Sequence, residues 1–126
     1  PYTTLFRSLA AGAVGHCGVI ANVAPELCAT MCDLALPVDA RQRAFEALVE
    51  LHDVMAAHHY PISGKYILQR RGLRLTLTCR DFDANIFTQR DRDAIDAFLE
   101  GFRFDVAEPG RLAQLGMKPG PSTWKD

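Results

Sequence analysis

Apolar residues recur every three or four positions in four stretches of the chain, a spacing that places them on one face of an α-helix. The pattern predicts a mainly α fold with about four to five helices and one short strand. The apolar stripes are Leu27, Met31, Leu34 and Ala35, then Ala44, Leu48, Leu51 and Met55, then Ile67, and finally Ala94, Ile95, Phe98, Leu99 and Phe102.

Local signals set the expected helix boundaries. Pro25 opens the first stretch and Pro37 ends it, since proline fits a first turn but cannot continue a helix. The second helix is expected over 39–58, where Tyr60-Pro61 forces an extended break. The third is expected over 62–71 with Gly72 as its C-cap, and Thr88 with Asp91 resembles a capping box that opens the fourth.

Two stretches favour extended backbone. Val14–Ile20 is short, apolar and interrupted by glycine, which is typical of a buried parallel strand. The residues before it, 9–13, have the pattern of a helix tail that ends near Gly12. Alternating leucines at 73, 75 and 77 indicate a short extended piece in the otherwise irregular segment 73–87.

Composition narrows the class of protein. The 126 residues are 48% hydrophobic and 23% charged, with a net charge of −1. A net charge near zero gives no electrostatic reason to expect a nucleic acid or an anionic membrane as partner. No apolar run approaches the roughly 20 residues of a membrane span. We expect a cytoplasmic protein whose four cysteines are reduced thiols.

Three motifs carry a family resemblance. The first is the run 15–25, in which Ala21-Asn22-Val23-Ala24 is its most specific part; the second is Tyr60-Pro61-Ile62-Ser63-Gly64-Lys65, and the third is Leu73-Arg74-Leu75-Thr76-Leu77. Over residues 9–100 the chain resembles the last barrel strand and the C-terminal helical region of the dihydrodipicolinate synthase and N-acetylneuraminate lyase family. That resemblance implies derivation from a (β/α)₈ barrel that performs Schiff-base chemistry on pyruvate.

The resemblance also implies that most of the enzyme lies outside this chain. A (β/α)₈ barrel needs roughly 250 residues, and the chain has 126. We expect the last strand and its helix in 9–36, the C-terminal helical region in 37–104 and a loosely ordered tail in 105–126. The family's catalytic lysine lies on the sixth strand, so we expect no catalytic, cofactor or metal residue here and no activity of the chain alone.

One residue of this chain lies near the substrate by resemblance. The family's main-chain carbonyl at the position of Cys17 lies beside the bound pyruvate and its imine. The run His16-Cys17-Gly18 departs from the family pattern, so the resemblance does not determine the shape of the pocket wall or the substrate. Lys65 falls on a helix outside the barrel, so we expect no imine there. The intact enzyme would take a small 2-oxo acid and form a homo-oligomer.

Other patterns have an ordinary structural interpretation beside a functional one. The glycines at 12, 15 and 18 have the wrong spacing for a dinucleotide loop and lack the basic neighbours of an RNA-binding loop. Cys28 and Cys32 share a helix face and are expected to be packing residues rather than zinc ligands. His58 and His59 lie at the end of a helix, where their protonated rings would interact favourably with the helix dipole. The functional alternative is a pH-sensing or ligand role. The basic stretch from Lys65 to Arg80 is expected to be a solvated face or to form salt links between neighbouring helices, with an anion site as the functional alternative.

Two further expectations concern the extent of the chain. Residues 1–8 are identical to the translation of a sequencing-library adapter, and we interpret them as an assembly artefact that replaced the upstream coding frame. The alternative to an enzyme fragment is a self-standing helical interaction module without catalysis. The genomic DNA upstream of Leu9 distinguishes the two hypotheses.

Overall fold

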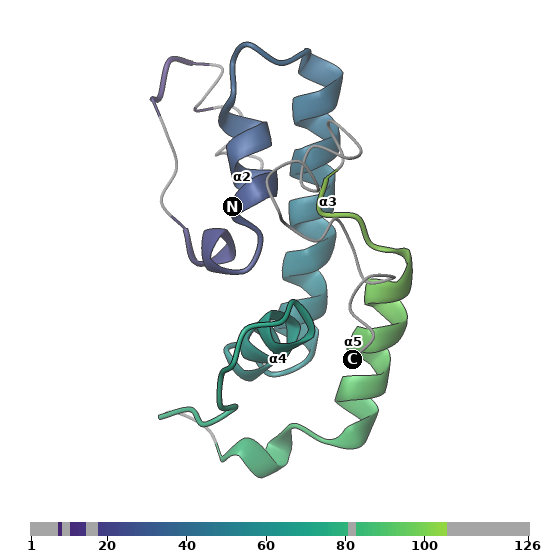
Figure 1. Ribbon diagram of the computed structural model, residues 1–126. Helices are drawn as coiled ribbons and strands as arrows, with labels where there is room; N and C mark the ends of the chain where they lie inside the picture. Colours follow the sequence, from purple (N-terminus) through teal and green to yellow (C-terminus); the bar gives the residue numbers. More distant parts are fainter. Residues whose placement is uncertain (1–7, 9–10, 15–17, 81–82, 106–126) are drawn as a thin grey trace.

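The computed structural model describes residues 8, 11–14, 18–80 and 83–105. These residues contain no β-strand, so the mainly α prediction is confirmed for the part of the chain that is described. Figure 1 shows one long helix with a shorter helix beside its first half and two more toward its other end. The elements are η1 (Val19–Asn22), α2 (Pro25–Cys32), α3 (Val38–Ala57), α4 (Ile62–Arg70), η2 (Ala84–Ile86) and α5 (Gln89–Gly101).

Helices α2 and α3 form an antiparallel hairpin. Pro25 occupies the first turn of α2, with Glu26 beside it where the helix dipole favours negative charge. The hairpin closes over apolar side chains, and the buried Arg41 donates its Nε to the Met31 carbonyl at 3.1 Å. That bond satisfies a carbonyl in the last turn of α2, which has no partner within its own helix.

The turn from α3 to α4 brings the two helices into close contact. His59 has φ 61°, and a cis peptide joins Tyr60 to Pro61 before α4 starts. A Cβ placed on Gly64 would lie 3.3 Å from both Met55 Cε and the Tyr60 ring. Glycine at this position therefore allows α4 to pack tightly on the end of α3.

Helix α4 ends in the glycine motif that the sequence predicted. Gly72 has φ 92°, and its N–H donates to Gln69 O at 2.9 Å. The next N–H, of Leu73, donates to Leu68 O at 3.0 Å, which completes a Schellman-type C-cap. The chain then runs back along α4, and Lys65 Nζ donates to the Thr78 carbonyl.

The capping box at the start of α5 is also confirmed. Thr88 N donates to Asp91 Oδ2 at 2.8 Å. Ile95 and Leu99 are fully buried, and Phe102 stacks edge-on against Phe104 with centroids 4.8 Å apart. A single apolar cluster joins all four helices; its largest fully buried side chains are Ile20, Leu27, Met31, Leu48, Leu51, Met55, Ile62, Ile67, Ile95, Leu99 and Phe104.

The predicted strand over Val14–Ile20 is wrong where the structure describes it. Gly18 is extended, but Val19 begins the 3₁₀ helix η1, with Ala21 N donating to Gly18 O at 3.1 Å. Residues 15–17 lie outside the described residues. A strand needs a neighbour to pair with, and none of the described segments offers one. Local i→i+3 hydrogen bonds satisfy this backbone instead.

A smaller prediction, the end of the first helix, is also wrong. Helix α2 ends at Cys32, before Leu34, because Asp33 turns extended and its side chain accepts from Ala35 N at 2.9 Å. Leu34 is consequently 65% exposed. Asp105, the first residue of the expected tail 105–126, is buried. Positions 106–126 lie outside the described residues.

Candidate functional site

The segment that follows Cys17 is the place where the resemblance locates chemistry. Cys17 itself lies outside the described residues, so the site is seen from Gly18 onward. Ile20, Val23 and Ala24 are 1%, 3% and 0% exposed, and Ala24 N donates to Ile20 O at 2.9 Å. Buried side chains therefore anchor this segment on the helical core.

A buried arginine ties the same segment to the end of α4. The Arg71 guanidinium donates to the Val23 carbonyl and to the Glu26 carboxylate, and it lies 4.0 Å from the centre of the Phe104 ring. The side chains of Arg71 and Glu26 are only 9% and 8% exposed. We call the four residues Val23, Glu26, Arg71 and Phe104 the clasp.

A small cavity of about 100 Å³ opens beside η1. Val19 and Ile20 form one wall, and the second half of α3 with Tyr60 forms the other. Its surface is mainly apolar, with the His52 ring and the Tyr60 side chain as its polar groups. A cavity of this size accommodates a few apolar heavy atoms and is smaller than a typical ligand pocket.

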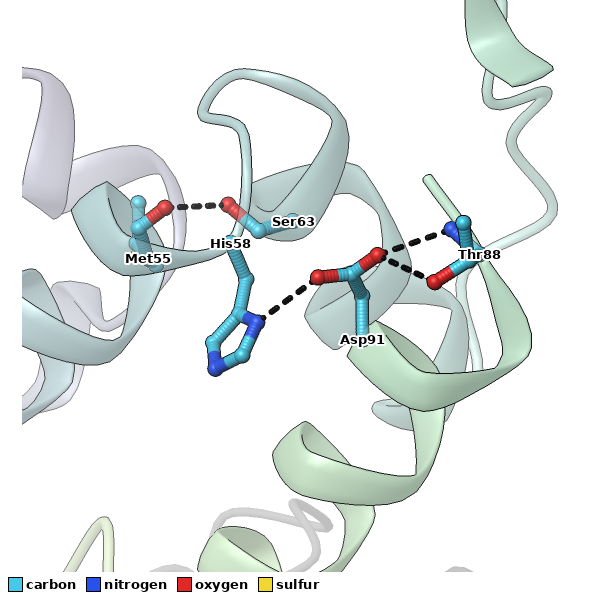
Figure 2. Close-up of polar contacts among 5 residues, drawn as sticks. All are labelled: Met55, His58, Ser63, Thr88 and Asp91. Carbon is cyan, nitrogen blue, oxygen red and sulfur yellow. Dashed lines mark hydrogen bonds and ion pairs between the residues drawn. The ribbon is translucent and has the colours of Figure 1, made fainter. Parts of the chain in front are cut away.

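The His58 ring pairs with the first turn of α5. Its Nδ1 lies 2.9 Å from Asp91 Oδ1, while Asp91 Oδ2 accepts from the hydroxyl and the N–H of Thr88 (Figure 2). The hydrogen bonds from His58 and Thr88 favour the charged carboxylate and hold the pKa of Asp91 well below its usual range. The pair joins the end of α3 to the start of α5.

Ser63 does not complete a Ser-His-Asp arrangement with this pair. Its hydroxyl is fully buried and donates to the Met55 carbonyl at 2.7 Å. Figure 2 shows the hydroxyl turned toward Met55 and away from the imidazole. The serine therefore stabilises the turn between α3 and α4 and has no nucleophilic role in this arrangement.

Two arginines of the basic stretch, Arg70 and Arg71, form salt links between helices, which was one of the alternatives that the sequence left open. Arg70 Nε lies 3.0 Å from Asp96 Oδ1 on α5. The Tyr66 hydroxyl donates to the other oxygen of that carboxylate at 2.9 Å, and burial with this hydrogen bond raises the pKa of Tyr66 to about 12. Lys65 donates to a main-chain carbonyl, which gives it an anchoring role.

Cys28 is a core residue and Cys32 is half-buried. Burial, with smaller contributions from Cys32 and Glu26, raises the pKa of the Cys28 thiol to about 11. Burial also raises the pKa of Cys32. A thiol with a raised pKa is a poor metal ligand because the thiolate is the binding form. Across the described residues, no group of three or more His, Cys, Asp and Glu side chains is arranged to hold a metal ion.

Two of these contacts were not predicted from the sequence. Arg71 and Glu26 are 45 positions apart, and His58 and Asp91 are 33 apart. Each residue was recognised separately, as part of a basic stretch, a helix first turn, a helix end or a capping box. No periodic pattern links members of such pairs, so only the fold brings them together.

Comparison with known proteins supplies the family context. The model of the dihydrodipicolinate synthetase family matches residues 3–99. The 4-hydroxy-tetrahydrodipicolinate synthase of Saccharophagus degradans is 42% identical over 80 residues, which cover 58% of this chain and 28% of that protein. The enzyme of the same name from Legionella pneumophila strain Philadelphia 1 is 42% identical over 72 residues, which cover 56% of this chain and 25% of that protein.

The chain thus spans about a quarter of the length of the curated relatives that it matches. No solved structure gives a significant match. Among the described residues, no helix is both long enough and apolar enough to cross a membrane.

Proposed function

Because the chain belongs to the dihydrodipicolinate synthetase family, we propose that it forms the C-terminal part of an enzyme that makes an imine between a lysine and a 2-oxo acid. The observation that carries this proposal is the family match over residues 3–99 of this chain. The aligned part covers only 28% of the Saccharophagus degradans enzyme. Pyruvate or a related 2-oxo acid is the substrate class. The appended helices would also contribute to a homo-oligomer in the cytoplasm.

The chemistry would begin in the rest of the polypeptide. A neutral lysine amine attacks the ketone carbon of the 2-oxo acid, and water leaves as the C=N bond forms. The protonated imine withdraws electrons, so a proton or a carbon substituent can leave the neighbouring carbon. This chain would contribute the main-chain carbonyl of Cys17 and the helical region behind it.

Lys65 is the lysine that this proposal excludes. It lies in the middle of α4 with its Nζ bonded to the Thr78 carbonyl. A nucleophilic lysine needs a lowered pKa, which comes from a desolvated pocket or a second cation nearby. The Lys65 amine is instead engaged by a main-chain carbonyl in an exposed hydrogen bond, and Lys65 does not line the cavity beside η1.

Borohydride trapping tests the proposal. The chain should gain no mass after treatment with pyruvate and borohydride, whereas the protein read from the contiguous genomic frame should gain one pyruvyl group on an upstream lysine. Mass spectrometry locates the adduct. An adduct on Lys65, or an intact protein that gains none with any 2-oxo acid tried, contradicts the proposal.

A self-standing interaction module is the second candidate. It is favoured by one observation, that the described helices enclose an apolar cluster of their own. A start codon and promoter directly before Leu9 in the genome would support it. A coding frame that continues upstream would support the enzyme.

A further inference from the structure

We propose that Arg71 is a positioning residue for the imine chemistry, because it fixes the backbone that follows the substrate-adjacent Cys17. The inference deepens the proposed function and rests on it. Arg71 touches neither substrate nor imine in this proposal. It acts through Val23, which lies between η1 and α2, and through Glu26 in the first turn of α2.

The clasp holds this segment at two points with one rigid group. One guanidinium nitrogen donates to the Val23 carbonyl and the other to the Glu26 carboxylate. The guanidinium is planar, and its donors keep a fixed angle, so two acceptors that share it are held in a fixed relation to each other. Lysine carries a single ammonium on a flexible stem and does not impose that relation.

The segment needs such a restraint because its own backbone supplies little. Its regular structure is η1, a 3₁₀ helix of four residues. Short 3₁₀ helices have poor hydrogen-bond geometry and rarely persist without help from their surroundings. The Val23 carbonyl lies between η1 and α2, and the Arg71 guanidinium supplies a donor to it.

Burial makes the restraint strong. Both charged side chains are more than nine-tenths buried, and the Phe104 ring covers one face of the guanidinium. Removing one member of a buried pair leaves the other charge without compensation in a region of low dielectric. Glu26 Oε2 is buried and has no hydrogen-bond partner among the described residues, so the carboxylate depends on Arg71 for its charge partner.

The clasp also connects this segment to distant parts of the chain. Arg71 is the C-cap residue of α4, and Phe104 follows α5. The helical region therefore reaches back to the segment that follows Cys17, and in a (β/α)₈ enzyme catalytic groups gather at the strand ends. Displacement of reacting groups by about 1 Å can slow a reaction by about 100-fold.

Hydrogen exchange on the chain tests the restraint directly. The variants are Arg71→Lys and Glu26→Gln, with Arg70→Lys as the matched control, since Arg70 is the neighbouring residue and pairs with α5 instead. We expect exchange in 18–26 to rise about tenfold in Arg71→Lys and less in Glu26→Gln, with 42–56 unchanged. A uniform rise over both segments, or no rise in 18–26, overturns the proposal.

Kinetics on the intact protein test the positioning role. At saturating pyruvate, Arg71→Lys should lower the rate of imine trapping about tenfold, and Arg70→Lys should leave it within about twofold. A lower melting temperature with an unchanged trapping rate means a purely structural role and overturns the proposal. If the unaltered intact protein traps no adduct, the proposed function fails instead, and the exchange data still show whether Arg71 fixes the segment.

Discussion

Different interactions stabilise the two helix pairs, α2 with α3 and α4 with α5. Leu27 and Met31 of α2 are fully buried against the apolar stripe of α3, which includes Leu48 and Leu51. Helices α4 and α5 also contribute Ile67, Ile95 and Leu99 to the apolar cluster, but charged groups add to their contact. Asp96 on α5 binds both the Tyr66 hydroxyl and Arg70 of α4.

The difference predicts how each region responds to its surroundings. Apolar burial is insensitive to salt and to moderate changes in pH. Ion pairs and charged hydrogen bonds weaken when salt screens them or when a carboxylate gains a proton. Helix α5 should therefore detach under conditions in which the α2–α3 hairpin stays folded.

The largest expected effect comes from the apolar region. Leu51→Ala removes a side chain that is 0% exposed and should lower the free energy of unfolding by about 2–5 kcal/mol. Urea denaturation followed by circular dichroism measures it. Leu34→Ala is the control, because Leu34 is 65% exposed, and it should change stability by no more than about 0.5 kcal/mol. Equal effects of the two substitutions would contradict the burial pattern.

Asp91→Asn should have the next largest effect, confined to α5. The substitution removes the charge that pairs with His58 and accepts from Thr88. The expected loss is about 1–2 kcal/mol, typical of a lost cap in a partly buried setting. Hydrogen exchange should accelerate in 90–101 and stay unchanged in 42–56. Asp93→Asn is the control, since Asp93 accepts only an exposed bond from Gln89.

The pH dependence of the stability should reflect the titration of Asp91. The pKa of Asp91 is lower in the folded chain than in the unfolded one, so its contribution is complete above the unfolded value, about pH 4. It is lost progressively as the pH falls below that value. The stability difference between the original chain and Asp91→Asn should therefore shrink from pH 6 to pH 2. A difference that stays constant over this range would contradict the assignment.

The smallest expected effect is that of Arg70→Gln. Arg70 and Asp96 are 40% and 35% exposed, and their 3.0 Å contact lacks the geometry of a hydrogen bond. Exposed pairs of this kind contribute about 0–1 kcal/mol. The loss should vanish in about 1 M salt, where charges are screened over a few ångströms. A loss that persists in high salt would mean that the arginine acts through packing.

Local patterns were sufficient to predict most of the helices. The stripe from Ala44 to Met55, the glycine after α4 and the capping box at Thr88 each depend on residues within a few positions of one another. Such signals do not depend on the tertiary fold, because their hydrogen bonds join residues within one or two helical turns of each other.

Features that need a distant partner were predicted poorly. Val19 and Ile20 have the composition of a strand, but composition does not provide a second strand, and they form η1 instead. One local signal was also missed: Leu34 follows the helical spacing, yet the Asp33 side chain accepts from the Ala35 N–H and α2 ends at Cys32. The position of Cys17 near a substrate came from family resemblance alone and stays a prediction.

The clasp has a consequence for the order in which the chain folds during synthesis. The hydrogen bond from Arg71 to Val23 joins residues 48 positions apart, and closing so long a loop costs more entropy than forming a local hairpin. The α2–α3 hairpin can pack as soon as residue 57 leaves the ribosome, but the segment after Cys17 must wait for α4. We therefore expect Val23 and the start of α2 to be among the last parts to reach their final position.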